Sequence, residues 1–194
     1  MEPDRLRAIV SAARAGSDQA YREILANFGP RLYGFFYRAT RSSHDAEDLL
    51  GEVMLRLVRR LPDYDEQGRF EPWLFSIAAN LVRDRIRRAQ VRPTAVSLDA
   101  ETGSGSALAE TLADVDRPVE AGLIRAEVME DLDRALQRLE PEARSMVLLR
   151  HFGQMSFREI AEVFQCPVGT VLAKVHRSLR ALRASLERTH GREE

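Results

Sequence analysis

The sequence predicts an all-α protein made of two small helical domains that a flexible linker joins. Apolar residues recur at helical spacing in both halves of the 194-residue chain, and no strand-like alternation is present. The stretch between the halves is acidic, contains glycine, serine and proline, and has little periodicity. We therefore expect one domain over residues 1–90, a flexible acidic linker over 91–120 and a second domain over 121–194.

Residues 45–61 predict a long amphipathic helix. Its apolar stripe follows the i, i+3, i+4, i+7 spacing and consists of Ala46, Leu49, Leu50, Val53, Met54, Leu57, Val58 and Leu61. Ser42 or Ser43 is the expected N-cap, and Pro62 is expected to end the helix. The acidic residues near its start suit the positive end of the helix dipole, so that their simplest interpretation is a solvated helix face.

A second helix is expected to follow Pro72. Its predicted buried stripe consists of Leu74, Ile77, Ala78, Leu81 and Val82. Asn80, Arg83 and Arg87 share another face at helical spacing. This helix therefore has one apolar face and one basic face.

Three aromatic residues, Phe70, Trp73 and Phe75, surround the start of that helix. Aromatic rings beside a basic track suit single-stranded nucleic acid, because bases stack on rings while cations neutralise phosphates. The alternative is that Trp73 and Phe75 belong to the core. From this half of the chain alone, both interpretations stay open.

In the second half, residues 124–139 predict a helix whose inward residues are Val128, Leu132, Ala135, Leu136 and Leu139, and Pro141 is expected to begin the next helix. Ser156 and Glu159 have the spacing of a capping box. The helix that this box opens breaks at Gln165-Cys166-Pro167, and another begins near residues 168–170. Two short helices joined by a tight turn, the second of them basic, predict a DNA-binding helix-turn-helix.

Small or apolar side chains occupy the positions where these two helices must approach. Ala161 is expected at their closest contact, and Val171 is expected to pack back into the core. Thr170, Lys174 and Arg177 share the outward face of the second helix, where they could meet phosphates or base edges. Without the turn, solvated surface charges would be the simpler interpretation.

The net charge of −1 conceals a separation of charge along the chain. Residues 83–92 and 174–188 are strongly basic, whereas residues 99–120 are strongly acidic. The chain has no apolar run long enough to cross a bilayer, and residues 1–14 lack the apolar core of a secretory leader. Its single cysteine excludes an internal disulfide, and its histidines are not at metal-ligand spacing. We expect a cytoplasmic protein without a cofactor, a metal or a small-molecule substrate, and not an enzyme.

The residues resemble a known family over almost the whole chain: the group 4 sigma factors of bacterial RNA polymerase, the extracytoplasmic-function (ECF) type of the sigma-70 family. The matching motifs are Ala15-Gly16-Ser17-Asp18-Gln19-Ala20-Tyr21, Asp45-Ala46-Glu47-Asp48-Leu49, Phe70-Glu71-Pro72-Trp73-Leu74-Phe75-Ser76-Ile77-Ala78-Ala79-Asn80 and Cys166-Pro167-Val168-Gly169-Thr170-Val171. Each motif is weak alone, but their order, the intervening linker and the chain length are specific together.

The resemblance implies three functional surfaces. Docking on the polymerase β′ clamp helices is expected of Asp45, Glu47, Asp48, Leu49, Glu52 and Leu55. Melting and recognition of the −10 promoter element are expected of Trp73, Asn80, Arg83, Asp84, Arg87 and Arg88, with residues 63–68 as a specificity loop and Asn80 facing a flipped base. Recognition of the −35 element is expected of Arg158, Thr170, Leu172, Ala173, Lys174, His176, Arg177 and Arg180.

The chain departs from the family in the recognition helix. Many relatives have a basic residue, Ser and Arg where this chain has Leu172, Ala173 and Lys174, so two hydrogen-bonding side chains are lost and Leu172 could contact a thymine methyl instead. Gln165 stands at a turn position often filled by glycine, where a left-handed backbone would cost about 1 kcal/mol. Cys166 is common at its position in relatives, and we interpret it as a small core residue.

The resemblance implies core RNA polymerase (through the β′ clamp helices and the β flap), promoter DNA and a cognate anti-sigma factor as partners. Such an anti-sigma factor could hold the chain at the inner membrane. Two alternatives stay open. One is a sigma-like decoy that binds only an anti-sigma factor, against which the basic side chains argue. The other is a plain helix-turn-helix repressor, which would leave residues 45–61 and the Trp73 segment without a role.

Overall fold

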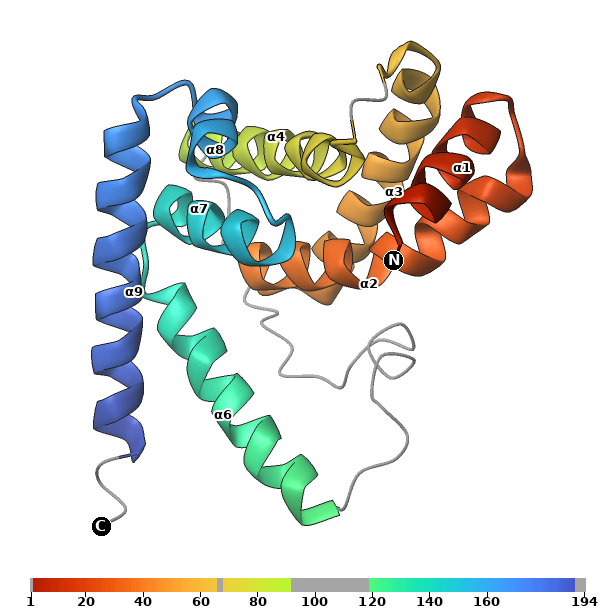
Figure 1. The fold of residues 1–194 in the computed structure, drawn as a ribbon. Helices are drawn as coiled ribbons and strands as arrows, with labels where there is room; N and C mark the ends of the chain where they lie inside the picture. Colours follow the sequence, from red (N-terminus) through yellow and green to blue (C-terminus); the bar gives the residue numbers. More distant parts are fainter. Residues whose placement is uncertain (1, 66–67, 92–118, 191–194) are drawn as a thin grey trace.

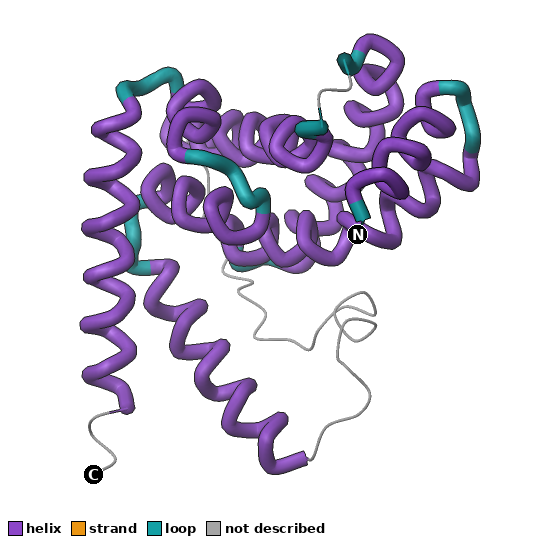
Figure 2. Tube along the Cα trace, viewed as in Figure 1, coloured by secondary structure: helices purple, strands orange, loops and turns teal. Residues whose placement is uncertain are grey.

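The computed structural model of the chain describes residues 2–65, 68–91 and 119–190, and all its regular structure in these residues is helical, which confirms the all-α prediction. An N-terminal unit comprises α1 (Pro3–Arg14), α2 (Asp18–Thr40), α3 (Ser43–Arg60), the short 3₁₀ helix η1 (Leu61–Asp63) and α4 (Phe70–Val91). A C-terminal unit comprises α6 (Val119–Gln137), α7 (Pro141–Phe152), α8 (Phe157–Phe164) and α9 (Val168–His190). In Figure 1, α6 and α9 diverge as two long arms from the rest of the molecule, and Figure 2 shows the short loops between helices.

Helix α3 begins and ends close to the predicted positions. Ser42 is the N-cap, since its hydroxyl accepts a hydrogen bond of 3.1 Å from the Asp45 N–H. The predicted stripe is buried at Ala46, Leu49, Leu50, Val53 and Leu57. Val58 departs from the prediction because it is 48% exposed. The outer edge of the stripe therefore lies at the molecular surface.

Helix α4 begins at Phe70, two residues before Pro72. The predicted apolar face is buried. Phe75 is buried as well, which agrees with the alternative that places it in the core. Trp73 is half-buried, with its ring centroid 4.5 Å from that of Tyr64. One of the two rings thus belongs wholly to the core, whereas the other lies at its edge.

The C-terminal unit confirms most of the predicted elements. Helix α7 begins at Pro141 as expected, and α6 begins at Val119, before both the predicted helix start and the predicted domain boundary at residue 121. Val128 was predicted to point inward but is 38% exposed. Leu179, which continues the apolar spacing of Val171 and Val175 along α9, is 48% exposed. Residues 92–118, most of the predicted linker, lie outside the described residues.

The two units pack against each other and share one cluster of buried apolar residues. Helix α7 lies against α2 and α4, and α8 lies against α4, as Figure 1 shows at the top of the molecule. This close contact places the second half of the chain directly on the face of α4 for which a role in nucleic-acid binding was predicted. The division into domains at residues 90 and 120 stays a prediction.

Candidate nucleic-acid interface

The helix-turn-helix forms as predicted. In the capping box, the Ser156 hydroxyl accepts from the Glu159 N–H, and the Glu159 carboxylate accepts from the Ser156 N–H at 2.7 Å. The turn reverses at Gln165, whose φ of 52° and ψ of 44° are left-handed, and the Cys166 N–H donates to the Ala161 carbonyl at 3.1 Å. The left-handed backbone predicted at Gln165 is therefore present.

Packing behind the turn also agrees with the prediction. Ala161 and Val171 are both buried, so a small side chain lies where α8 and α9 approach and an apolar one anchors α9. Cys166 is half-buried and packs against the core, as its interpretation as a core residue requires. The turn thus holds the first residues of α9 at the surface.

Most of the residues predicted to read the −35 element lie on the accessible side of this motif. The exposed members are Arg158, Thr170, Ala173, His176, Arg177 and Arg180, and Leu172 is half-buried. The Arg177 Nε donates to the Ala173 carbonyl at 3.3 Å within the same helix. Its guanidinium is consequently held along the surface, where phosphates or base edges can reach it.

Lys174 is the exception in this set, because its ammonium pairs with two carboxylates. They belong to Glu142 of α7 and to Glu140, the N-cap of α7. Its ammonium lies 2.9 Å from a Glu142 oxygen and 3.4 Å from a Glu140 oxygen. The hydrogen bond that Lys174 donates to Glu142 is the main cause that raises the pKa of Lys174; burial opposes it, and the charges of both glutamates add to it. Only 21% of this side chain is exposed. Contact with DNA would therefore require Lys174 to leave these partners.

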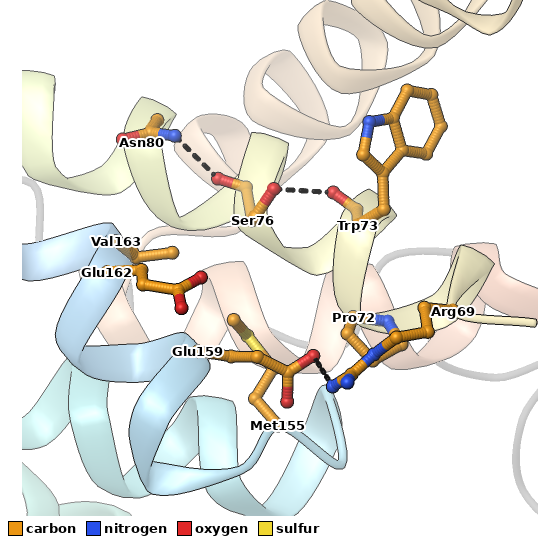
Figure 3. Close-up of a pocket in the computed structure, with 9 residues that line it drawn as sticks. All are labelled: Arg69, Pro72, Trp73, Ser76, Asn80, Met155, Glu159, Glu162 and Val163. Atoms are coloured by element: carbon orange, nitrogen blue, oxygen red, sulfur yellow. Dashed lines mark hydrogen bonds and ion pairs between the residues drawn. The ribbon is translucent and has the colours of Figure 1, made fainter. Parts of the chain in front are cut away.

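Three of the predicted −10 residues lie at or beside the contact between α4 and α8. The Asn80 amide donates to the Ser76 carbonyl at 2.9 Å, and the Ser76 hydroxyl donates to the Trp73 carbonyl at 2.7 Å. The Arg83 guanidinium donates to the Val163 carbonyl of α8. In Figure 3 the Trp73 ring points away from α8, whereas Asn80 lies on the same side of α4 as Val163 and Glu162.

The last part of the predicted −10 surface is open. Arg87 and Arg88 are exposed, and Arg87 lies 3.5 Å from an oxygen of the half-buried Asp84. These residues continue the basic track of α4 beyond the contact with α8. The structure therefore divides the predicted −10 surface into a covered part and an accessible part.

The predicted polymerase-docking residues lie together on α3, with one exception. Glu47, Asp48 and Leu55 are exposed, the last to 56%. Glu52 pairs with Arg56 at 2.8 Å, and Asp45 pairs with Arg85 of α4. These residues form an acidic face of α3, with the exposed Leu55 at its C-terminal end.

Leu49 is the exception in that set, because it is only 7% exposed and belongs to the core. Its place in the apolar stripe turns its side chain inward, so it cannot form part of an exposed docking surface. This corrects the expectation for Leu49, which supports the acidic face from beneath.

A polar cavity of about 340 Å³ at the α4–α8 contact was not foreseen from the sequence. Its lining residues are Arg69, Pro72, Trp73, Ser76, Asn80, Met155, Glu159, Glu162 and Val163. Arg69, just before α4, forms an ion pair with Glu159 of α8 across it (Figure 3). Burial acts to raise the pKa of Glu159, but the hydrogen bonds from Ser156 and the charge of Arg69 outweigh burial, and the pKa lies below its ordinary value.

Nothing local in the sequence signals that contact. Arg69 and Glu159 are 90 positions apart by their numbers, and each has an ordinary local role, in a loop and in a capping box respectively. In the part of the chain that the structure describes, no group of three or more His, Cys, Asp or Glu side chains is arranged to hold a metal. Nor, over the same residues, does any helix combine the length and apolarity needed to cross a bilayer.

The fold and these surfaces define an all-helical DNA-binding protein that carries a helix-turn-helix in its C-terminal unit. Residues 24–92 match the family described as Sigma-70 region 2, and residues 129–182 match the one described as Sigma-70, region 4. The chain is 31% identical over 173 residues to the RNA polymerase sigma factor CarQ of Myxococcus xanthus. The matched region covers 89% of this chain and 92% of CarQ. It is 29% identical over 180 residues to the ECF RNA polymerase sigma factor SigW of Bacillus subtilis, with 91% and 94% covered. The chain belongs to the sigma-70 family and is an ECF sigma factor, a transcription initiation factor of bacterial RNA polymerase.

Two solved structures share the fold. CnrH in complex with the cytosolic domain of CnrY has a TM-score of 0.61 at 22% identity, over 93% of this chain and 96% of that one. The sigma factor RpoE of Bartonella quintana, in complex with the anti-sigma factor NepR, has a TM-score of 0.58 at 20% identity, over 86% and 96%. At these identities the likeness concerns the arrangement of the helices.

Proposed function

We propose that this ECF sigma factor binds core polymerase through the acidic face of α3, reads the −10 element with α4 and reads the −35 element with α9. The observation that supports this most strongly is the exposed basic face of α9 behind a complete helix-turn-helix turn. A non-catalytic initiation factor needs surfaces for polymerase and DNA rather than a reaction centre. Its proposed place of action is the cytoplasm, where polymerase and promoter DNA are found.

Transcript mapping tests this function directly. The purified chain is added to sigma-free core polymerase with fragmented genomic DNA, and the transcript starts are mapped. Starts that share paired upstream elements are the expected result. Core binding without transcripts would favour the decoy, whereas failure to bind core would favour a plain helix-turn-helix repressor.

The docking surface is tested by Asp48→Arg. Asp48 is exposed and has only an i, i+4 contact of 3.5 Å with His44, so the substitution reverses the surface charge without disturbing packing. Loss of core-polymerase binding with an unchanged unfolding midpoint is expected. The matched control is Asp4→Arg, which reverses an exposed first-turn acid on α1. Equal core affinity of the two variants would disprove the docking assignment.

The −10 assignment is tested by Asn80→Ala. Its amide bonds only the backbone of its own helix in this structure, which leaves little stability to lose. The substitution should change the preference for −10 sequences more than the affinity for core polymerase. An unaltered promoter profile in the mapping experiment would remove Asn80 from the reading surface.

We also propose control by an anti-sigma factor. CnrH was solved with the cytosolic domain of CnrY, and the Bartonella RpoE was solved with the anti-sigma factor NepR. Both share the fold of this chain. The candidate surface is an apolar cavity of about 510 Å³ between α6, α7 and α9, which Met129, Leu132, Leu179 and Leu182 help to line. Membrane attachment through that partner stays a hypothesis. Co-purification from the native cell, with Leu179→Asp as the variant expected to lose the partner, tests it.

A further inference from the structure

Helix α3 has a glycine in its interior that the described part of the chain does not explain. Gly51 lies near the middle of Ser43–Arg60, is exposed and does not have a positive φ. Glycine inside a helix destabilises it relative to alanine, because its backbone loses more freedom on folding. A Cβ built at Gly51 would meet nothing within 4 Å. Alanine would therefore fit at this position and would stabilise α3.

Two other glycines within the described helices have neighbours that explain them. A Cβ at Gly29 of α2 would lie 3.1 Å from a side chain of the same helix, and one at Gly34 would lie 3.0 Å from the Phe152 ring. Gly169 is as open as Gly51, but it lies in the first turn of α9, in the surface proposed to meet DNA. Because glycine lets another backbone approach closely, an open glycine inside a helix indicates a contact outside the chain.

Gly51 lies on a stripe of α3 that runs opposite the buried one. At 3.6 residues per turn, five positions share this narrow face within an arc of about 80°. We call them the outer stripe, and they are His44, Asp48, Gly51, Leu55 and Val58. All five are exposed, Leu55 to 56% and Val58 to 48%. Two large apolar side chains thus lie at the surface on the C-terminal side of the glycine.

The spacing of the outer stripe predicts how a partner would pack on it. Its positions follow one another at intervals of four, three, four and three residues, which is the 3.5-residue period of a left-handed coiled-coil contact. A second helix can lie along such a stripe at a crossing angle of about 20°. The two backbones can come closest at Gly51, where α3 has no side chain. The outer stripe is therefore shaped to receive a helix.

The two halves of the outer stripe differ in chemistry. On the N-terminal side of Gly51, the exposed Glu47 and Asp48 are acidic. On its C-terminal side, the exposed Leu55 and Val58 are apolar. A complementary helix has Lys or Arg facing the acids and apolar residues facing the other half. A second copy of α3 does not fit, because a parallel pair would oppose like charges and an antiparallel pair would set Asp48 against Leu55.

We propose that one helix of core polymerase packs along the outer stripe and crosses α3 at Gly51, with basic side chains on the acidic half and apolar ones against Leu55 and Val58. The inference rests on the proposed role of α3 in polymerase binding. It makes Gly51 the residue that sets the distance between the two helices, and it adds Val58 to the docking surface. The helix stability that α3 loses at Gly51 is offset when the partner binds.

The test uses Gly51→Ala and Gly51→Leu in the full chain. Urea unfolding should give a higher midpoint for Gly51→Ala than for wild type, since alanine favours the helix. Competition with fluorescently labelled wild-type chain for sigma-free core polymerase should show weaker binding, by about 5- to 150-fold for Gly51→Leu and by less for Gly51→Ala, because a side chain overpacks the crossing. Ala8→Leu, which enlarges an exposed small side chain of α1, is the matched control. Stability and affinity then change in opposite directions, which a purely structural role of Gly51 would not produce.

Val58→Asp distinguishes a packed helix from an acidic docking face alone. If basic groups of polymerase met only the acids of α3, a further carboxylate would leave binding unchanged or strengthen it. Against a packed helix, the same carboxylate is buried beside apolar groups and should weaken binding by about tenfold or more. Val58 is 48% exposed in the free chain, so the substitution should leave the fold intact, and urea unfolding verifies this.

Each other outcome contradicts a specific step. If Gly51→Leu keeps wild-type affinity while Asp48→Arg does not bind, the crossing at Gly51 is overturned and docking through α3 stands. If Val58→Asp binds as tightly as wild type, no helix packs on the apolar half. Wild-type affinity of all three variants would refute the proposed role of α3, and the inference with it. A lower urea midpoint for Gly51→Ala, or an equal loss of affinity in Ala8→Leu, would overturn the assignment of Gly51 to an external contact.

Discussion

Arg177 and Lys174 lie one helical turn apart on α9, yet their different contacts predict opposite responses to substitution. Arg177 is exposed and donates only to its own helix at 3.3 Å, so it can contact DNA without losing a partner. Removing such a contact typically costs about 1–3 kcal/mol, so Arg177→Ala should weaken −35 binding about 5- to 150-fold. If Arg177 contacts a phosphate, the slope of log K against log salt should also become shallower by about 0.9.

Lys174 already has partners, since its Nζ lies 2.9 Å from a carboxylate oxygen of Glu142 and 3.4 Å from one of Glu140. Ion pairs between partly exposed groups are worth about 0.2–1 kcal/mol each. Glu142→Gln should weaken the closer one and release Lys174 toward phosphate, so that −35 binding becomes tighter by up to about 1 kcal/mol, roughly fivefold. The neutral amide also keeps the shape of the replaced side chain.

Fluorescence anisotropy with a labelled −35 duplex from a mapped promoter, repeated at several salt concentrations, measures both effects. Arg188→Ala is the control, because it removes an exposed arginine near the far end of α9. Equal affinities for Arg177→Ala and Arg188→Ala would make Arg177 a spectator. If Glu142→Gln has no effect although Lys174→Ala weakens binding, the ion pairs do not restrain Lys174, and the reasoning from its contacts is refuted.

Three further predictions concern stability and are measured by urea unfolding. Gln165→Gly should raise the unfolding free energy by about 1 kcal/mol, because glycine adopts the left-handed turn without strain; a lower value would mean that the Gln165 side chain stabilises the turn. Arg144→Met should lower it by about 3 kcal/mol, since the carbonyls of Ala39, Leu136 and Gln137 lose a charged donor, and a change below about 1 kcal/mol would contradict a stabilising role of these hydrogen bonds. The stability that Glu159 adds over Glu159→Gln should be complete at pH 7, above its ordinary pKa, and lost as the pH falls through its lowered folded pKa. A difference that persists to pH 2 would contradict that sign.

The helix boundaries could be predicted because their determinants are local. Ser42, Pro141 and the Ser156–Glu159 box act within one turn of the helices they begin, so their spacing is visible in the chain. The burial of Leu49 could have been inferred from the same stripe that predicted α3. It was instead assigned to docking through the family motif, which marks a segment and does not distinguish its inner face from its outer face.

The edges of the helix faces were harder to predict. Val58 continues the periodicity of α3, and Leu179 continues that of α9, but each side chain is 48% exposed. Periodicity indicates which side of a helix is apolar, whereas burial also requires a neighbouring element at that height. Val128 of α6, 38% exposed, shows the same limit.

The contacts between the N-terminal and C-terminal units could not be predicted, because the residues that form them are distant in sequence and each side chain looks ordinary alone. Arg144 resembles a surface arginine on an amphipathic helix until the end of α2 is placed beside it. Gly34 has no turn or left-handed backbone to mark it, and its role appears only against Phe152. Lys174 likewise acquires its partners from α7 and its N-cap only in the folded chain.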